Sequence, residues 1–203
     1  MSRYPAMFTA LKERGEGAFV PFVMVGDPDP DTSEAVIEAL IAGGADALEL
    51  GVPFTDPVAD GPTIQKAHVR ALAAGVGFQD CLEVVQRVRR RHPQLPIGML
   101  IYGNVPFAMG LERFYSQCAQ AGIDSVLLPD VPIRESAAFS RAAEDGRCRR
   151  RLHRPAVGRG RDAGRGGGGL TRLRLRRLPG GGDRNRVGLL HRGARRVGRA
   201  PAR

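Results

Sequence analysis

A chain of 203 residues with 42% hydrophobic content is long enough to fold into one sizeable domain around an apolar core. Its formal net charge of +10 is uneven, because residues 146–203 hold 19 Arg and 2 Asp, which leaves residues 1–145 at −7. No stretch approaches the ~20 apolar residues of a membrane span, and the N-terminus lacks the apolar run of a signal peptide. The three cysteines lie far apart without CxxC spacing. These features argue against a membrane protein and predict a soluble protein of the cytoplasm.

Hydrophobic periodicity predicts alternating helices and strands over the first 145 residues. In chain order we expect an amphipathic helix at about residues 4–14, an apolar strand within 17–25, a helix over 31–44 and a strand over 45–54. Helices over 61–75 and 78–93, a strand over 95–103, a helix over 111–124, a strand over 125–132 and a helix from 133 follow. Strands that are apolar on both faces are typical of a parallel sheet covered by helices. The fold class is therefore α/β, and an eight-fold β/α barrel and a doubly wound sheet both fit the four repeats.

Three carboxylates lie in or just after the second predicted strand. Glu49 stands among apolar neighbours, and burial there would raise its pKa toward a value suited to proton transfer near neutral pH. Asp56 and Asp60 follow in a loop stiffened by prolines, and two acids in different environments can take different protonation roles. Equally, Asp56 and Asp60 can cap the helix that begins near Pro62, and Glu49 can form a salt bridge.

No other side chains suggest chemistry by their spacing. The histidines, for which a structural or solvated role is expected, are His68, His92, His153 and His191. Neither a metal-ligand spacing nor a Ser or Cys nucleophile motif is present in the sequence.

The segment over residues 47–65, ALELGVPFTDPVADGPTIQ, resembles the signature of the tryptophan synthase alpha chain family. Further segments that resemble the family in order and spacing are LKERGEGAFVPFVMVGDPDP, AGGADALELGVPF, GMLIYGNVPF and GIDSVLLPDVP. The resemblance covers about residues 1–145. It implies the first four β/α units of a (β/α)8 TIM barrel, and an enzyme of tryptophan biosynthesis that cleaves indole-3-glycerol phosphate to indole and glyceraldehyde 3-phosphate.

The resemblance also implies roles for single residues. Glu49 and Asp60 would be the catalytic pair: Glu49 would protonate the ring carbon that bears the side chain and accept the proton of the adjacent hydroxyl, while Asp60 would stabilise the charge that develops at the ring nitrogen. Phe22, Leu100 and Tyr102 would line the indole pocket, although from the residues alone they are ordinary core positions. Neither a metal nor an organic cofactor is implied for this reaction.

The family further implies a partner, a beta chain that carries pyridoxal phosphate and forms an alpha2beta2 heterotetramer with the alpha chain. The residues that match the loops facing this partner are Pro53, Asp56, Asn104, Phe107 and Pro132. Taken singly, each could equally belong to a surface turn.

The resemblance stops near Asp145, and residues 146–203 have almost no strand or helix period, so we expect an irregular, disordered Arg/Gly-rich tail. If Arg is encoded as CGN and each codon is read from its second base, residues 151–157 permit VFIAPP, residues 169–178 permit GFVYVVS and residues 178–187 permit SRAGVTGTE. These are the family's fifth strand, a later apolar strand and the loop after strand six, in family order. We therefore hypothesise that the reading frame slips near residues 144–146.

A half-barrel would leave its first and fourth strands as open edges and would lack the phosphate-binding loops, so we expect an impaired enzyme. The alternative is an inactive half-barrel whose basic tail binds nucleic acid or acidic surfaces nonspecifically. No aromatic residue interleaves the arginines of the tail, so a specific nucleic-acid partner is not expected.

Overall fold

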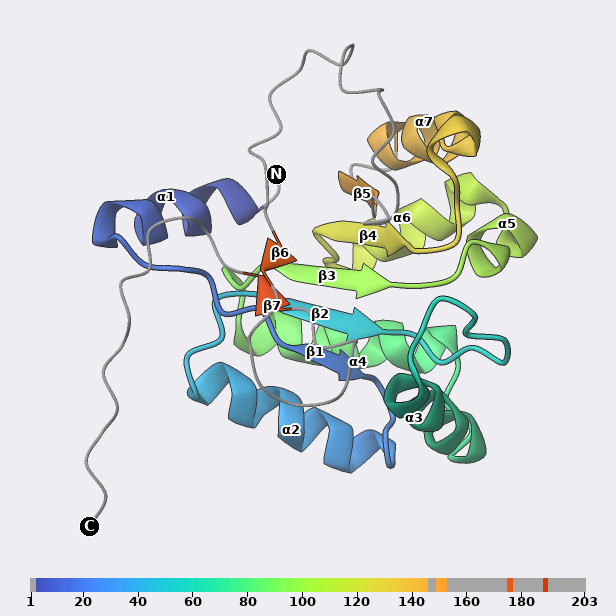
Figure 1. Ribbon diagram of the computed structural model, residues 1–203, viewed down its shortest axis with the longest axis horizontal. Coiled ribbons are helices and arrows are strands. Elements are labelled where there is room, and N and C mark those ends of the chain that lie inside the picture. The colour runs from blue at the N-terminus through green and yellow to red at the C-terminus, as the bar shows by residue number, and fades with distance from the viewer. Residues whose placement is uncertain (1–2, 146–148, 153–174, 177–187, 190–203) are drawn as a thin grey trace.

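The computed structural model of the chain describes residues 3–145, 149–152, 175–176 and 188–189. Helices and strands alternate along it (Figure 1). The strands are β1 (Phe22–Met24), β2 (Leu48–Gly51), β3 (Ile97–Leu100), β4 (Ser125–Leu128), β5 (Arg149–Leu152), β6 (Leu175–Arg176) and β7 (Gly188–Leu189). The helices are α1 (Tyr4–Arg14), α2 (Pro30–Ala42), α3 (Pro62–Ala73), α4 (Phe78–Arg91), α5 (Asn104–Met109), α6 (Leu111–Ala121) and α7 (Ala137–Asp145), and a 3-10 turn, η1, covers Ile133–Glu135.

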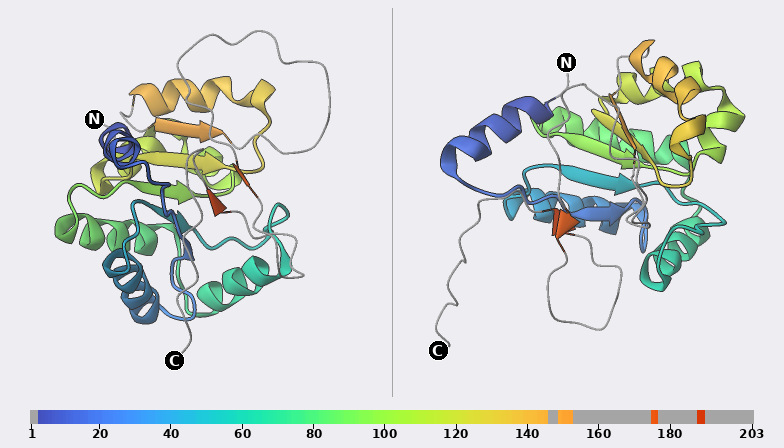
Figure 2. Two further views of the ribbon diagram at one scale, coloured as in Figure 1. Left: turned by 60° about the vertical axis from the view of Figure 1, so that its left-hand side comes forward. Right: turned by 45° about the horizontal axis from the view of Figure 1, so that its top comes forward.

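Strands β1 to β5 form one parallel sheet in the order β1-β2-β3-β4-β5, which is also their order in the chain. A doubly wound sheet reverses its direction of growth at a switch point, whereas a barrel adds its strands in chain order. The observed order therefore decides between the two folds in favour of the barrel. Figures 1 and 2 show α2 and α4 along the β1–β3 part of the sheet, and α6 and α7 beside β4 and β5.

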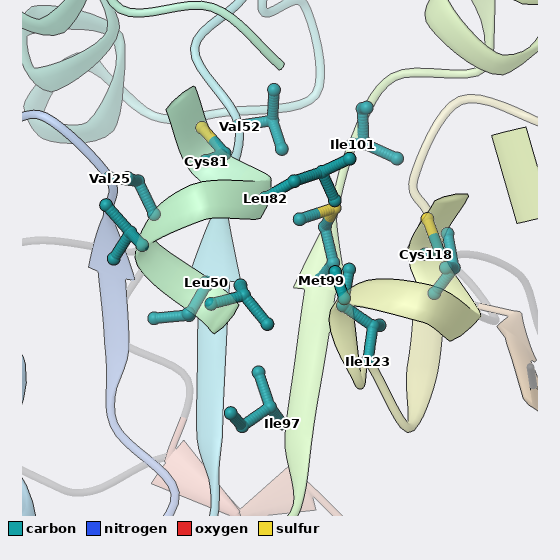
Figure 3. Close-up of a cluster of buried hydrophobic side chains, with 14 of the residues drawn as sticks. Val25, Leu50, Val52, Cys81, Leu82, Ile97, Met99, Ile101, Cys118 and Ile123 are labelled. Atoms are coloured by element: carbon teal, nitrogen blue, oxygen red, sulfur yellow. The ribbon is translucent and has the colours of Figure 1, made fainter. Parts of the chain in front are cut away.

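Side chains alternate between the two faces of this sheet, as the pleat of a strand requires. The helix-facing layer is apolar and buried, and Figure 3 shows strand residues packed against side chains of α4 and α6. Labelled members of this layer are Val25, Leu50, Val52, Cys81, Leu82, Ile97, Met99, Ile101, Cys118 and Ile123. Positions between them, such as Phe22, Glu49 and Leu100, belong to the opposite face of the sheet, where Phe22 packs against a small cluster of Met24 with the α3 residues Ala67 and Ala71.

Helix α1 lies at the amino ends of the strands (Figure 1). The Tyr4 hydroxyl is 3.1 Å from the Ser125 hydroxyl at the start of β4, and the Arg3 guanidinium pairs with Asp124 at 3.0 Å. Asp124 also pairs with Arg89 of α4 at 2.8 Å. Charged pairs thus stabilise the amino ends of the strands. The loops that follow the strands lie at the opposite, carboxyl ends.

Several elements differ from the sequence prediction before residue 145; for example, the helix predicted from residue 133 begins as the 3-10 turn η1, and α7 starts only at Ala137. Helix α2 begins at Pro30, because the carboxylate of Asp29 accepts the Thr32 backbone N–H at 2.8 Å and caps the helix one residue earlier than expected. The short helix α5 was not predicted at all. Its side chains Val105 and Met109, one turn apart, pack against the core.

The expectation that the fourth strand is an open edge is wrong. Strand β5 pairs with β4 in parallel, with Ser125 opposite Arg149 and Leu128 opposite Leu152. Parallel pairing uses backbone N–H and C=O groups, which an arginine-rich segment supplies as well as an apolar one. Within the described residues the outer strands are therefore β1 and β5. The expected disorder of the tail concerns residues that lie mostly outside the described ranges; of that tail, β5, β6 and β7 are described, and β6 pairs with β7.

Candidate active site

Glu49 lies on strand β2, on the face of the sheet opposite the main apolar layer. The register places it directly opposite Phe22 on β1 and Gly98 on β3, and Leu100 lies one layer nearer the carboxyl ends, opposite Gly51. Phe22, Glu49 and Leu100 are all partly buried. Three of the residues predicted for catalysis and substrate binding therefore share one face and stand on neighbouring strands.

Two glycines near Glu49 lie directly against other side chains. A Cβ on Gly51 would meet the Phe22 ring at 2.6 Å, and one on Gly98 would meet the Tyr4 hydroxyl at 3.0 Å and the Ser125 hydroxyl at 3.1 Å. Any larger residue at Gly51 would therefore force the Phe22 ring to move. These contacts explain why a strand pair otherwise rich in bulky residues carries glycine at the positions flanking the carboxylate.

Asp60 lies in the loop between β2 and α3, at the carboxyl end of the sheet (Figure 1). Its Oδ2 atom accepts a hydrogen bond from the Tyr102 hydroxyl at 2.8 Å and lies 3.1 Å from His68 Nε2. The Tyr102 hydroxyl in turn accepts the Ala59 backbone N–H at 3.0 Å. The structure thus joins Asp60 to Tyr102, two residues that were predicted separately as catalytic and as pocket-lining.

Tyr102 is buried and stacks on Phe54, with the ring centroids 4.9 Å apart and the rings inclined by 15°. Burial raises the pKa of Tyr102, and its hydrogen bond to Asp60 raises that pKa further. The phenol therefore stays protonated at neutral pH and acts as a donor toward Asp60. The alternative interpretation, that Asp60 caps helix α3, is not what the structure has: Gly61 stands at the N-cap position, without a side-chain cap.

Sequence reasoning missed the place of His68. This side chain is buried, and its Nδ1 accepts the Phe54 backbone N–H at 3.0 Å while its Nε2 faces Asp60. The structure shows that the buried residues of α3 are Ala67, His68 and Ala71, so one ring stands on an otherwise small, apolar helix face; the sequence alone shows only that these three residues have helical spacing. A buried imidazole needs partners for both nitrogens, which points to polar groups facing that helix.

The residues predicted to face a partner lie in the segments that follow β2, β3 and β4, and two of them, Asn104 and Phe107, are on helix α5. Four of them are exposed: Asp56, Asn104, Phe107 and Pro132. Pro53 is buried, so in this structure it shapes the loop and presents no surface. Sequence reasoning missed Val58, which is 81% exposed in the loop after β2, while Phe107 is 75% exposed on α5. Two large apolar side chains thus stand in solvent at the carboxyl end of the sheet.

The described part of the chain offers no group of three His, Cys, Asp or Glu side chains able to hold a metal ion. In the same residues no helix has the length and apolar character needed to cross a membrane. The chemistry available at the site is that of two carboxylates in different surroundings, one on a strand and one in a hydrogen-bonded loop.

A parallel sheet whose strands follow in chain order, with helices packed along it and Asp60 in a loop at its carboxyl end, defines the chain as part of a β/α barrel. The model of the tryptophan synthase alpha chain family matches residues 8–151, which is most of the chain. The chain belongs to the tryptophan synthase alpha chain family.

Curated relatives match the same region. The tryptophan synthase alpha chain of Corynebacterium aurimucosum is 63% identical over 144 residues, which cover 71% of this chain and 52% of the relative. That of Klebsiella pneumoniae is 58% identical over 143 residues, covering 70% of this chain and 53% of the relative. The chain therefore spans about half the length of the curated relatives it matches.

Solved structures agree with the fold. Tryptophan synthase subunit alpha from Legionella pneumophila superposes with a TM-score of 0.72 at 33% identity, covering 74% of this chain and 57% of that one. The aminoacrylate-bound tryptophan synthase from M. tuberculosis gives a TM-score of 0.71 at 30% identity, covering 75% and 61%. At these identities and coverages the described sheet corresponds to a partial TIM barrel of this family.

Proposed function

We propose that the chain carries the catalytic carboxylates of a tryptophan synthase alpha reaction, the cleavage of indole-3-glycerol phosphate to indole and glyceraldehyde 3-phosphate. The observation that supports this most is the arrangement of Asp60, which is held by Tyr102 and His68 at the carboxyl end of the strand that carries Glu49. In β/α barrels, catalytic groups are found at this end of the strands.

In the proposed reaction Glu49 first donates a proton to the ring carbon that bears the glycerol phosphate side chain. The ring becomes a cation at its nitrogen, and the Asp60 carboxylate stabilises that charge by accepting the ring N–H. Glu49 then takes the proton of the adjacent hydroxyl, the carbon–carbon bond breaks, and its electron pair returns to the ring as the aldehyde forms. Carboxylic acids supply every proton transfer, so the proposal needs no cofactor on this chain.

Phe22, Leu100 and Tyr102 are proposed to bind the indole ring. Phe22 and Leu100 flank Glu49 on neighbouring strands, and Tyr102 bonds to Asp60. In this proposal the flat indole ring lies against these three side chains, with its ring carbon toward Glu49 and its ring N–H toward Asp60. The family match ends at residue 151, before the later strands whose loops would grip the phosphate. We therefore expect weak substrate binding and slow turnover, because phosphate binding supports both.

We propose that the exposed loops at this end bind a tryptophan synthase beta chain, which would carry the pyridoxal phosphate. This proposal is supported by the similarity of the chain to a subunit of the tryptophan synthase a2b2 complex of Pyrococcus furiosus, with a TM-score of 0.63 at 32% identity. The residues proposed for the interface are Asp56, Asn104, Phe107 and Pro132, with Val58 added by its exposure. Apolar side chains ringed by polar ones are typical of the centre of an interface. We further propose a cytoplasmic location, with which the free, buried thiol of Cys81 agrees.

Release of indole by the purified chain tests the proposed reaction. Glu49→Gln and Asp60→Asn each remove one ionisable group at nearly constant shape, and we expect each to lower the rate by at least ~100-fold, as loss of a general acid or base does. The matched control is Glu83→Gln on the outer surface of α4, where the side chain is 68% exposed. Indole release that survives both substitutions would contradict the proposal.

The frame slip near residues 144–146 remains our proposal for the tail. The family match ends at residue 151, a few residues past the proposed slip. The DNA sequence tests it: codons after residue 146 that cannot spell VFIAPP, GFVYVVS and SRAGVTGTE in the shifted frame would rule it out. If the tail is genuine, its charge of +17 predicts salt-dependent, nonspecific binding to nucleic acid, which a gel shift at two salt concentrations would detect.

A further inference from the structure

The imidazole of His68 connects both ends of the loop that carries Asp60. Its Nδ1 receives the backbone N–H of Phe54, two residues after the buried Val52, and its Nε2 lies against the carboxylate of Asp60. The imidazole side chain is 1% exposed and that of Asp60 is 16% exposed, so the contact is largely shielded from water. A single ring therefore fixes the entry and the exit of the loop.

The hydrogen bonds settle which nitrogen of His68 carries the proton. A backbone N–H can only donate, so Nδ1 must be the acceptor and must be unprotonated. The remaining proton of a neutral imidazole is then on Nε2, which donates it to Asp60 at 3.1 Å. If both ring nitrogens carried a proton, the Nδ1–H of His68 would point at the backbone N–H of Phe54, and neither group could accept a hydrogen bond.

Both hydrogen bonds to the Asp60 carboxylate fall on the same oxygen. Oδ2 receives the Tyr102 hydroxyl and the His68 Nε2–H, and the bond of the Ala59 N–H to the Tyr102 oxygen orients that hydroxyl as a donor. An oxygen with two donors must be unprotonated. Among the described residues no side chain bonds to Oδ1, which therefore has acceptor capacity for a donor from outside the chain.

The ring itself is held rigidly. His68 is flanked on α3 by Ala67, and Ala67 and Ala71 pack against Met24 of β1. On the other side the Tyr102 ring meets the imidazole edge-on at 6.3 Å, and Phe54 stacks on Tyr102. The hydrogen bonds that link Phe54, His68 and Asp60 therefore cannot shift without disturbing the packing of α3 or the stacking of Phe54 on Tyr102.

We propose that His68 is a positioning residue for Asp60: as a neutral Nε2–H donor it fixes the carboxylate so that Oδ1 is presented to the substrate's ring N–H. This inference rests on the proposed function, because it assigns a purpose to the orientation of Asp60. It also makes a claim about the free protein, namely the tautomer of His68 and the bond to Oδ2, which holds or fails without any substrate.

Two substitutions separate positioning from simple closure of the loop. His68→Asn places its amide oxygen where Nδ1 stood, which keeps the Phe54 bond, but it is too short to reach Asp60. His68→Gln reaches Asp60 with its amide N–H and loses the acceptor for Phe54. If His68 positions Asp60, we expect kcat for indole release to fall about 10- to 100-fold in the Asn variant with KM changed less than about threefold, and to be largely retained in the Gln variant. A role in loop closure alone predicts the reverse order.

The effect of His68→Asn should also depend on Asp60. In an Asp60→Ala background the substitution should cause no further loss, since the group that it positions is gone. An Asn variant as active as the wild type, or one that slows the Asp60→Ala chain as much as it slows the wild type, would overturn the proposal.

An NMR experiment on the full chain, labelled with ¹⁵N-histidine, tests the geometry without activity. We expect His68 to show an unprotonated Nδ1 and a protonated Nε2 whose hydrogen exchanges slowly with water, and Asp60→Ala to accelerate that exchange. A protonated Nδ1, or exchange that ignores Asp60→Ala, would overturn the inference even in an active enzyme. A wild-type chain that releases no indole would instead contradict the proposed function, and the NMR result would still decide the placement of His68.

Discussion

Two aspartates at opposite ends of the same sheet are bonded in contrasting ways. Asp124, at the amino ends, is 1% exposed and is saturated: Oδ1 accepts the backbone N–H and the guanidinium of Arg3, and Oδ2 accepts Arg89 and the Ile97 N–H. Asp60, at the carboxyl ends, has neutral donors and both fall on one oxygen. The first carboxylate has no acceptor capacity to spare, whereas the second has a whole oxygen available.

This difference separates a carboxylate that holds the fold from one that is suited to bind a substrate. Around Asp124, Arg89 also donates to the backbone carbonyls of Gly122 and Leu95, so one cluster joins α4 to the starts of β3 and β4. Burial lowers the pKa of Arg89, and the charge of Asp124 partly offsets this effect. A buried guanidinium of this kind depends on its carboxylate, and the fold should depend on both.

The largest expected effect is on stability, from Asp124→Asn. The amide removes the negative charge and leaves the Arg89 guanidinium buried without its partner, a change that typically costs about 3–5 kcal/mol of the free energy of unfolding. Because a domain has only about 5–15 kcal/mol in total, the denaturation midpoint should fall sharply. Urea unfolding followed by circular dichroism measures this loss.

Glu16→Gln is the control for that substitution. Glu16 also pairs with an arginine, Arg14 at 2.7 Å, but both side chains are more than half exposed. Exposed pairs contribute little, so we expect a change below about 0.5 kcal/mol. Equal effects of the two substitutions would remove the contrast between the buried cluster and an ordinary surface pair.

Two tyrosines sharpen the comparison further, because each places its hydroxyl at one end of the sheet. Tyr102→Phe removes the donor to Asp60 and leaves the Ala59 N–H without its acceptor, so we expect a loss of about 1–2 kcal/mol in stability and about tenfold in the rate of indole release. Tyr4→Phe removes the bond to Ser125 and should cost about 1 kcal/mol with no change in rate. Unfolding and indole-release assays on both variants make the test, and a slower rate in the Tyr4 variant would contradict it.

Much of this arrangement could be predicted from the sequence. Apolar runs located β1 to β4, and the period of two along a strand puts Glu49 on the face away from the buried Leu48 and Leu50. The nearness of Phe22 and Leu100 to Glu49 was expected only from the family resemblance, and the register places Phe22 opposite Glu49 and Leu100 opposite Gly51.

The contact between His68 and Asp60 could not be predicted in the same way. It depends on how α3 is rotated above the loop, and that rotation is set by the packing of Ala67 and Ala71 on Met24, a residue more than 40 positions away. The pairing of β5 was missed for another reason. A side-chain pattern does not report backbone pairing, so a segment of three arginines and a leucine gave no strand signal.

A smaller effect than that of Asp124 is expected at Glu34, a carboxylate with charged donors and partial exposure. Glu34 on α2 accepts Arg91 at 2.5 Å and Arg87 at 2.8 Å, and its side chain is 20% exposed. Burial alone would raise the pKa of Glu34, but the bonds from Arg91 and Arg87 outweigh it and hold the pKa below its ordinary value of 4.5.

A lowered pKa in the folded state fixes the sign of the pH dependence. As the pH falls below about 4.5 the unfolded chain takes up the proton first, so the stabilisation by Glu34 is complete above that pH and is lost as the pH falls through the folded pKa. We expect Glu34→Gln to lose about 1 kcal/mol at pH 7 and much less at pH 3, a convergence that urea unfolding at the two pH values would show. If Glu34→Gln lowered the free energy of unfolding equally at both pH values, Glu34 would act through packing and not through its charge. The contrast between charged and neutral donors at the two ends of the sheet would then matter less for stability.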